Sequence, residues 1–359
     1  MNIWFAANIP LGSSGGVARS MQGLAEGMRM LGHRTEIIMN ASRKGRSYLV
    51  FALKLALRLF FQILNPPDWI IARSTDGIGC ALLIKALALK TRVAIHNHGW
   101  EEYAYELERR LPQGIVYPQT TWKARMIRFP LLHACLALSS CCLCGTISEI
   151  RWLKKKYPRH HQKFHYTPNG VHVLDRGFWM DRNDIPLNIL SIGSITWKKN
   201  LYHTIAVFEE LVRLLPQSRL FLIGTGLEKN QMPCQLKEEI TVVSEVNPNE
   251  MSRWYMTCPY LISSSRYEGG HSFALLEALS YACVVFASSI SSSAEIIRNK
   301  YNGLLITGAD VKNDAAAISA ILKERELLVH MRRHAFYSAR RNRWERQVKR
   351  MERGLCRGH

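Results

Sequence analysis

Long uncharged apolar segments are missing from this sequence. It has no run of about 20 consecutive apolar residues, the length that a helix needs to cross a bilayer, so we expect no membrane-spanning helix. The first ten residues, MNIWFAANIP, lack the basic segment of a secretory signal peptide and predict a first strand instead.

Acidic residues are scarce, with 28 Asp and Glu against 48 Lys and Arg. The formal net charge of +20 favours an anionic partner: membrane lipid, an anionic polysaccharide or a nucleic acid.

A metal-binding cysteine pattern is also absent. Of the nine cysteines, Cys141, Cys142 and Cys144 lie together in the apolar run 136–147, and no second pair at zinc-site spacing accompanies them. We therefore expect buried free thiols in a reducing compartment and no metal site.

What is present is the alternation of an α/β protein. Hydrophobic residues make up 47% of the sequence, which is enough for packed cores. The chain of 359 residues is too long for one ordinary domain. Short apolar runs alternate with helical periodicity along the chain, which predicts parallel sheets with helices on both faces. We expect an N-terminal domain (1–178), a linker within 175–186 and a C-terminal domain (185–335). A basic helix is expected over 332–353, and the C-terminal segment 336–359 is expected to be a basic helix that packs back on the N-terminal domain.

The segment 263–279 carries the strongest functional pattern. A buried strand is predicted just before it, a glycine pair breaks the chain, and a helix is predicted from Phe273. Glu268 then lies in the loop and Glu277 in the helix. Backbone N–H groups at a helix start favour an anion, and carboxylates beside a phosphate site suit a ligand with hydroxyls next to its phosphates. The segment predicts a nucleotide-sugar site.

Other candidate site residues follow predicted strands, where ligands bind in doubly wound sheets. Glycines at 12–16 follow the first strand, and the loop 193–200 ends in two lysines. His96, Asn97 and His98 follow the predicted strand 92–95. A histidine here can hydrogen-bond a sugar or a reacting oxygen, whereas a zinc site lacks an evident third ligand.

A basic and strongly apolar helix is predicted over 42–64. Its basic residues are Arg43, Lys44, Arg46, Lys54 and Arg58. Such a helix can lie in a membrane interface with its basic groups at anionic head groups. It can equally be a core helix whose few basic side chains extend into water.

With these segments in order, the chain resembles the retaining GT-B glycosyltransferases of the family-4 type, which build bacterial cell-surface polysaccharide and lipopolysaccharide. The resemblance is nearly full length. It rests on the segments 14–17, 147–148, 168–171, 193–200, 224–226, 268–277, 294–297 and 302–305.

The resemblance implies two Rossmann-like domains with parallel sheets facing an interdomain cleft. It implies a hexosyltransferase-type enzyme that moves a sugar from a UDP- or GDP-sugar to a lipid-linked or polysaccharide acceptor with retention of configuration. No metal or other cofactor is implied, and no nucleic acid. The enzyme would be cytoplasmic, peripheral on the anionic inner face of the cell membrane.

The same resemblance assigns individual roles. His98 and Glu268 are catalytic, and His96, Asn97 and Asn169 contact the sugar or the acceptor. Donor contacts fall on Gly15, Gly16, Gly193, Ser194, Lys198, Lys199, Gly224, Gly226, Gly269, Gly270, His271, Ser272, Phe273 and Glu277. Among these, Lys199 neutralises the donor diphosphate and Glu277 holds the ribose hydroxyls.

The sequence departs from the family pattern in its second half. Eight residues, in place of the usual seven, separate Glu268 from Glu277, and Ser194 stands where the family usually has Arg. Ala282 and Val284 replace a usual Gly and Pro. A non-catalytic nucleotide-sugar- or glycan-binding protein of the same fold therefore remains an alternative. A nucleic-acid binder rests on charge alone, because no nucleic-acid-binding motif is present.

Overall fold

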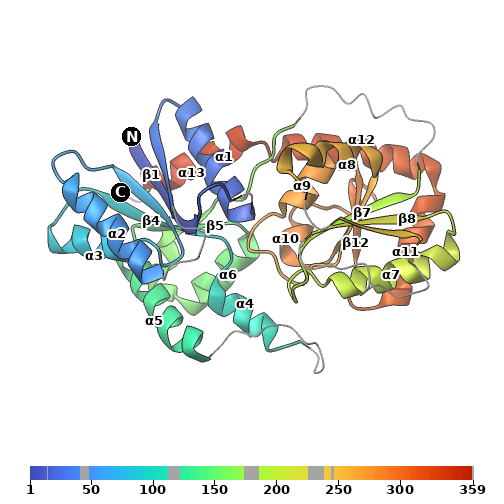
Figure 1. Ribbon diagram of the computed structural model, residues 1–359, viewed down its shortest axis with the longest axis horizontal. Helices are drawn as coiled ribbons and strands as arrows, with labels where there is room; N and C mark the ends of the chain where they lie inside the picture. Colours follow the sequence, from blue (N-terminus) through green and yellow to red (C-terminus); the bar gives the residue numbers. More distant parts are fainter. Residues whose placement is uncertain are drawn as a thin grey trace. The chain divides into compact units, whose positions relative to one another are not determined.

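The chain forms two compact α/β units (Figure 1). The computed structural model describes residues 1–13, 15–40, 48–111, 122–173, 186–224, 238–243 and 246–357. Of the described residues, Met1–Arg110, 122–170 and 344–357 belong to the first unit, and Leu111 and Val171–Arg343 belong to the second. The predicted linker falls, except for Pro186, outside the described residues.

The first unit contains a six-stranded parallel sheet in the order β2-β1-β3-β4-β5-β6. Its strands are β1 (Asn2–Pro10), β2 (Arg34–Asn40), β3 (Trp69–Arg73), β4 (Arg92–Asn97), β5 (Cys141–Cys144) and β6 (Phe164–Tyr166). Its helices are α1 (Gly16–Met30), α2 (Tyr48–Phe61), α3 (Ile78–Ala86), α4 (Glu101–Glu108), α5 (Trp122–Leu138), α6 (Ile147–Lys156), the 3-10 helix η1 (Pro158–Lys163) and α13 (Trp344–Arg357). The three clustered cysteines of β5 are buried free thiols, as predicted.

The second unit also contains a six-stranded parallel sheet, in the order β12-β11-β10-β7-β8-β9. Its strands are β7 (Asn188–Ile192), β8 (Arg219–Ile223), β9 (Ile240–Val243), β10 (Tyr260–Ser263), β11 (Val284–Ser288) and β12 (Gly303–Ile306). Its helices are α7 (Leu201–Leu214), η4 (Pro248–Glu250), α8 (Met251–Thr257), α9 (Phe273–Ser280), α10 (Ser291–Ala294), α11 (Val311–Lys323) and α12 (Arg325–Arg340).

Both faces of the second sheet are covered, so its strands are apolar on both sides. Tyr260 and Ile262 of β10 pack into the core under α7 and α11, while Leu261 between them packs into the core under α8, α9 and α12. The two helix layers lie on opposite faces of the sheet in Figure 1. The prediction of two Rossmann-like domains with parallel sheets is confirmed.

The prediction of one basic helix over 332–353 is wrong. Two helices share this range, because α12 ends at Arg340 and α13 begins at Trp344. The two helices pack in different units. Ala335 and Ala339 of α12 are buried in the second core. Trp344 of α13 is buried in the first unit, where its ring lies so close to α1 that a Cβ on Gly23 would approach it to 2.4 Å. The expected boundary after residue 335 therefore falls inside α12.

Helix α2 buries one face and exposes another apolar face. Phe51, Ala52, Leu55 and Leu59 are buried against the first sheet. The exposed large apolar side chains of this helix are Leu49, Val50, Leu53, Leu57, Phe60 and Phe61. Arg43, Lys44 and Arg46 lie outside the described residues. Across the residues that the structure describes, no helix combines the length and the apolar character that crossing a bilayer requires.

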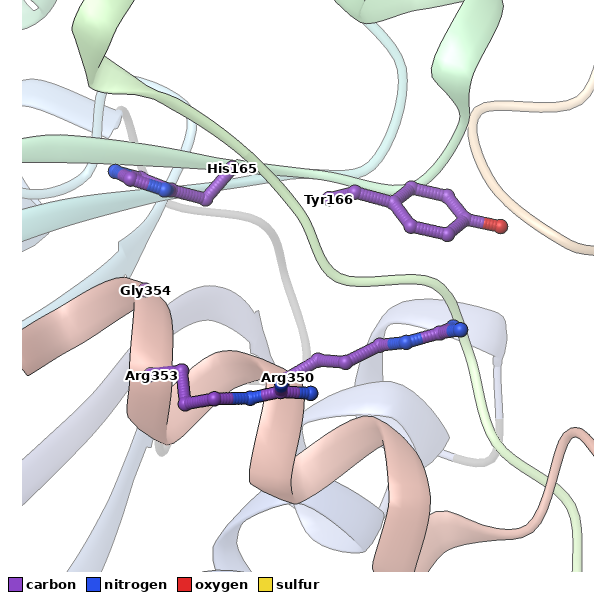
Figure 2. Close-up of a pocket in the computed structure, with 5 residues that line it drawn as sticks. All are labelled: His165, Tyr166, Arg350, Arg353 and Gly354. Atoms are coloured by element: carbon purple, nitrogen blue, oxygen red, sulfur yellow. The ribbon is translucent and has the colours of Figure 1, made fainter. Parts of the chain in front are cut away.

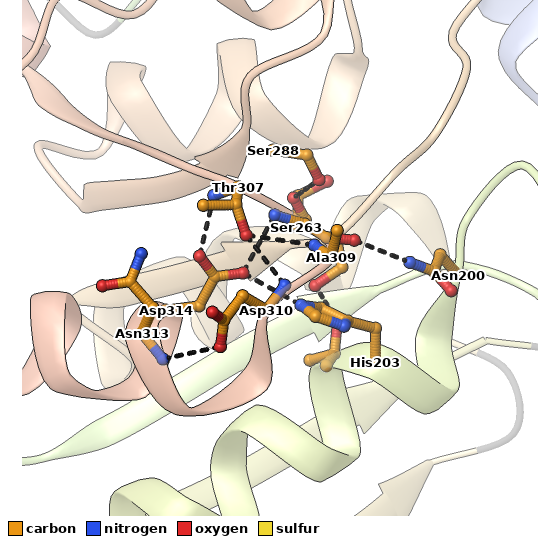
Figure 3. Close-up of polar contacts among 12 residues, drawn as sticks. Asn200, His203, Ser263, Ser288, Thr307, Ala309, Asp310, Asn313 and Asp314 are labelled. Atoms are coloured by element: carbon orange, nitrogen blue, oxygen red, sulfur yellow. Dashed lines mark hydrogen bonds and ion pairs between the residues drawn. The ribbon is translucent and has the colours of Figure 1, made fainter.

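A buried polar network fixes the connection between β12 and α11 (Figure 3). Asp314 is 1% exposed and accepts hydrogen bonds from the backbone N–H groups of Thr307 (2.7 Å) and Gly308 (2.9 Å). Its other close contact is Nε2 of His203, on α7, at 2.9 Å. Asn200, which precedes α7, donates to the Gly308 carbonyl at 3.4 Å. The network therefore holds the start of α7 and the loop before it.

Replacing Asp314 with alanine should destabilise the fold by about 3 kcal/mol, because two buried N–H groups and His203 lose their acceptor. Urea unfolding measures the loss. Asp310→Ala is the matched control on the same helix: Asp310 is exposed and caps α11 by accepting from Asn313 N at 3.0 Å, so its loss should cost about 1 kcal/mol. Equal losses in the two variants would contradict the assignment.

Candidate functional site

In the second unit, two loops meet where the strand order reverses. β7 and β10 are neighbours in the sheet, but the chain continues from β7 to β8 and β9 on one side and from β10 to β11 and β12 on the other. Open parallel sheets bind ligands at the carboxyl ends of such a strand pair. The loop after β7 and the loop after β10 both start there.

A salt bridge joins these two loops. Nζ of Lys199 lies 2.5 Å from Oε1 of Glu268, and the side chains are 28% and 15% exposed. The hydroxyl of Ser265 donates to the same carboxylate oxygen at 2.8 Å. The backbones are joined as well, because Arg266 N–H donates to the Lys198 carbonyl at 2.7 Å. The structure thus brings together a cation and a carboxylate that lie far apart in sequence.

The neighbouring lysine has different surroundings. Nζ of Lys198 lies 5.8 Å from the ring centroid of Trp197 and 5.3 Å from that of Tyr267. The two rings stack with their centroids 6.3 Å apart and an interplanar angle of 18°. Such cation–π contacts hold Lys198 on an aromatic platform, whereas Lys199 faces the carboxylate.

Glu277 lies on α9, as predicted, and is oriented by a tyrosine that the sequence did not identify. The hydroxyl of Tyr255, on α8, donates to Oε2 of Glu277 at 2.9 Å. The Tyr255 ring is itself held by stacking on Tyr281, with centroids 5.4 Å apart. No local pattern links Tyr255 to Glu277, because the contact depends on how α8 packs beside α9.

The predicted anion-binding loop leads directly into α9. Gly269, Gly270 and His271 precede Ser272, which has an extended backbone, and Phe273 is the first helical residue. The first turn of α9 carries no acidic residue, so the positive end of the helix dipole is not neutralised there. His271 is 2% exposed, and its Nε2 lies 3.3 Å from Oε2 of Glu295.

The glycines after β7 and β8 place two backbones in direct contact. Gly193 N–H donates to the Ile223 carbonyl at 2.9 Å, and Gly224 N–H donates to the Val243 carbonyl at 3.1 Å. Gly224 has φ +157°, and a Cβ there would lie 1.9 Å from the carbonyl oxygen of Gly193. Ser194 follows Gly193 and is partly exposed, while Gly226 lies outside the described residues.

The sheet of the first unit also reverses its strand order, between β1 and β3. The backbone N–H of Asn8, in β1, donates to Oδ2 of Asp76 at 2.7 Å. Asp76 follows β3 and is 5% exposed, and this burial raises the pKa of its carboxyl to about 6 despite the nearby Arg73 and Arg128. Sequence reasoning missed Asp76; the available signal was a polar residue just after a buried strand.

The predicted glycine loop of this unit precedes α1. Gly15 is the residue before the helix and has φ −67° and ψ 167°, and Gly16 is the first helical residue. Within the described part of the chain, a Cβ on Gly15 would meet no atom within 4 Å. The structure itself therefore places no steric demand for glycine at this position. Ser14 lies outside the described residues.

His96 and Asn97 are the last residues of β4, where a loop was predicted, and both are buried. The rings of His96 and His98 have centroids 4.1 Å apart. Burial lowers the pKa of His96 to about 4 and that of His98 well below its ordinary value, so both imidazoles are neutral near pH 7. Nδ1 of His96, Nδ2 of Asn97 and Nε2 of His98 are shielded from solvent and have no hydrogen-bond partner among the described residues. Unpaired buried polar atoms of this kind mark a place where a ligand or water completes the hydrogen bonds.

Glu149 anchors the loop that follows β4. It is 1% exposed and its Oε1 accepts a hydrogen bond from Trp100 N at 2.5 Å. Glu149 lies on α6, and the side chain of Thr146 caps this helix by accepting a hydrogen bond from Glu149 N at 3.2 Å.

Asn169, which is predicted to contact the sugar or the acceptor, lies in the loop after β6, at the edge of the first sheet. Among the residues described, no three or more His, Cys, Asp or Glu side chains gather in a way that suits a metal ion.

The buried carboxyl of Asp76 makes stability depend on pH. Its pKa is raised in the folded state, so the folded state holds a proton that the unfolded state has lost between about pH 4 and pH 6. The stabilisation is complete below this window and is lost as the pH rises through 6. Asp76→Asn should therefore gain about 2 kcal/mol over the wild type on going from pH 4.5 to pH 7.5. Denaturant unfolding at both pH values measures this, and parallel pH profiles for the two proteins would contradict it.

Solved structures of low sequence identity share this fold over nearly the full chain. The catalytic domain of starch synthase IV from Arabidopsis thaliana, bound to ADP and acarbose, matches with a TM-score of 0.76 at 13% identity and covers 99% of each chain. Anabaena Alr3699/HepE in complex with UDP and glucose matches with a TM-score of 0.73 at 13% identity, again over 99% of each chain. The lipopolysaccharide outer core galactosyltransferase WaaB, in its apo form, matches with a TM-score of 0.70 at 13% identity over 99% of each chain. The architecture is therefore that of the GT-B proteins.

Two family models match the chain one after the other. The model described as Glycosyltransferase Family 4 matches residues 14–173, and that described as Glycosyl transferases group 1 matches residues 180–337. A Haemophilus influenzae protein described as an "Uncharacterized glycosyltransferase" is 21% identical over 265 residues, covering 70% of this chain and 67% of the relative. Together with the fold, these matches place the chain among the GT-B glycosyltransferases.

Proposed function

We propose that the protein moves a hexose from a UDP- or GDP-sugar to a lipid-linked or polysaccharide acceptor, with retention of anomeric configuration. The observation that carries the proposal is the salt bridge between Lys199 and Glu268, which lies where the second sheet reverses its strand order. Two further observations support it. Glu277 is oriented nearby on α9, and two proteins of the same fold were solved with UDP or ADP bound.

The donor diphosphate would lie at the start of α9, within reach of Lys199. Backbone N–H groups and the ammonium then stabilise the negative charge that grows on the leaving diphosphate, with no metal ion in this role. Glu277, held by Tyr255, would accept hydrogen bonds from the two ribose hydroxyls. Glu268 and the loop that follows it would face the hexose.

Transfer would proceed on one face of the sugar. The bond between the anomeric carbon and the diphosphate oxygen breaks as the acceptor oxygen bonds to the same carbon. The acceptor proton passes to the departing phosphate oxygen. In the first unit we assign sugar or acceptor contacts to His96, Asn97, His98 and Asn169. The neutral imidazoles would act as hydrogen-bond partners of hydroxyl groups and not as cations.

We also propose that the protein binds the anionic inner face of the cell membrane. The exposed apolar face of α2 supports this. Lys54 is exposed beside Leu53 and Leu57 on this helix. Arg58, in contrast, serves the fold, because it pairs with Glu36 at 2.5 Å. Large apolar side chains beside a lysine are the combination that binds an interface containing anionic lipid.

A panel of nucleotide sugars tests the donor proposal. The matching donor should raise the melting temperature, because a ligand present at 100 times its Kd stabilises the native state by about 2.7 kcal/mol. Product analysis with lipid-linked and polysaccharide acceptors should then detect transfer and the anomeric configuration. If no donor stabilises the protein, the proposal fails. Stabilisation without transfer to any acceptor identifies the non-catalytic binding protein instead.

Vesicle sedimentation at physiological salt tests the membrane proposal. The protein should sediment with vesicles of phosphatidylglycerol in phosphatidylcholine, and Leu53→Glu on α2 should abolish this. Leu214→Glu, at an exposed leucine on α7 of the second unit, is the matched control and should sediment like the wild type. Binding that survives Leu53→Glu, or a shift of RNA at the same salt, would contradict the proposal.

A further inference from the structure

A cationic pocket lies in the first unit between the edge strand β6 and helix α13 (Figure 2). It has a volume of about 250 Å³ and is lined by His165 and Tyr166 from β6 and by Arg350, Arg353 and Gly354 from α13. None of the donor, sugar or acceptor residues assigned above lines it. No sequence pattern indicates this pocket, because a strand and a helix far apart in sequence form it.

The lining carries positive charge and no carboxylate. Arg350 and Arg353 are three residues apart on α13 and therefore lie on the same side of the helix. The acidic residues of α13 are Glu345 and Glu352, and neither lines the pocket. The carboxylate of Glu352 is engaged by His33, whose Nε2 lies 2.7 Å from Oε1.

Arg350 is held in place before any ligand arrives. Its side chain extends toward the ring of Tyr166 (Figure 2). The guanidinium lies 5.2 Å from the centroid of that ring, and one of its nitrogens donates to Oε1 of Gln347 at 2.8 Å. Burial and the nearby charges of Arg346 and Arg353 lower the pKa of Arg350 from its ordinary value. An anion in the pocket would relieve this crowding of like charges.

The size and donor set indicate the kind of anion. Guanidinium groups present planar sets of N–H donors that match the oxygens of a phosphate. Gly354 lets the helix approach the strand closely, because even a Cβ there would lie 3.3 Å from Cβ of His165. We propose that this pocket binds the phosphate group of a phosphate ester or of a phospholipid head group, separately from the donor site.

Calorimetric titration with inorganic phosphate tests the site. Arg353→Ala and Arg350→Ala should each weaken phosphate binding at least tenfold. Lys349→Ala is the matched control: it removes one positive charge from an exposed position on the same helix, outside the pocket, and should stay within twofold of the wild type. Because Arg353 is exposed, its replacement should leave the unfolding midpoint unchanged, so this variant carries the test if Arg350→Ala does not fold.

Two comparisons separate this site from others and identify the source of the phosphate. Lys199→Ala, in the second unit, should retain the phosphate binding that Arg353→Ala loses. Vesicles of phosphatidylglycerol in phosphatidylcholine are tested in parallel: vesicle binding that is lost in Arg353→Ala assigns a lipid head group, whereas vesicle binding that Arg353→Ala retains while it loses phosphate binding assigns a soluble phosphate ester. The proposal is overturned if the wild type binds neither probe, or if Lys349→Ala loses as much binding as Arg353→Ala.

Discussion

Replacing Lys199 with alanine should reduce sugar transfer by a factor of at least about 100 while the protein stays folded. The proposed role of this ammonium is to meet charge that develops on the leaving diphosphate, an interaction that grows in the transition state and therefore acts on kcat. The side chain is 28% exposed and contributes little to a core, so stability should change only slightly. Steady-state kinetics with the identified donor, together with an unfolding curve, measure both quantities.

The salt bridge to Glu268 offers a second explanation that must be separated from the first. If Lys199 served only to neutralise Glu268, then Lys199→Ala would cause no further loss of activity in the Glu268→Gln background. If Lys199 meets the diphosphate, Lys199→Ala reduces transfer by a similar factor in the wild-type and Glu268→Gln backgrounds, and a double-mutant cycle distinguishes the two outcomes. Lys323→Ala, on α11 of the same unit, is the charge-matched control and should keep full activity. Full activity in Lys199→Ala would refute the assigned role.

Glu277→Ala is expected to weaken donor binding as well as transfer. The carboxylate would hold ribose hydroxyls in both the ground state and the transition state, so its loss should raise KM more than it lowers kcat. Tyr255→Phe removes only the hydrogen bond that orients this carboxylate. It should therefore produce a smaller increase in KM, and an increase as large as that of Glu277→Ala would contradict a purely orienting role.

The strands and the loops after them are predictable from local pattern. Buried parallel strands are short continuous apolar runs, and β10 stands out as such a run directly before the polar and glycine-containing segment 263–272. The glycine pair before Phe273 marks the change from strand to helix. The amino-acid pattern alone therefore places Glu268 in the loop and Glu277 on α9 correctly.

What pattern did not predict depends on contacts between distant segments. The contact of Asp76 with the Asn8 backbone depends on the pairing of β1 with β3, and the contact of Tyr255 with Glu277 depends on the packing of α8 beside α9. The break after Arg340 has the same origin. Only Asn342, a poor helix former among arginines, marks it locally, and the chain there leaves one hydrophobic core for another.

Gly224→Ala should lower the stability of the protein by at least about 3 kcal/mol or prevent it from folding. The new Cβ would lie 1.9 Å from the carbonyl oxygen of Gly193, an overlap with backbone that no rotamer change can relieve. Because Gly193 and Gly224 directly follow β7 and β8, relief requires these strands or the loops after them to move apart. Nucleotide binding by any folded fraction should then be lost as well, since the loop after β7 carries Lys199.

Two other glycines separate the causes of this effect. At Gly12, φ is +80° and a Cβ would meet no atom of the described residues within 4 Å, so Gly12→Ala should cost only about 1 kcal/mol of backbone strain. Gly15→Ala involves neither strain nor overlap and should leave the unfolding midpoint unchanged. Denaturant unfolding of the three variants tests this order. A loss at Gly224 no larger than that at Gly12 would show that the loops after β7 and β8 are free to separate, and the close contact between their backbones would then have no part in shaping the proposed donor site.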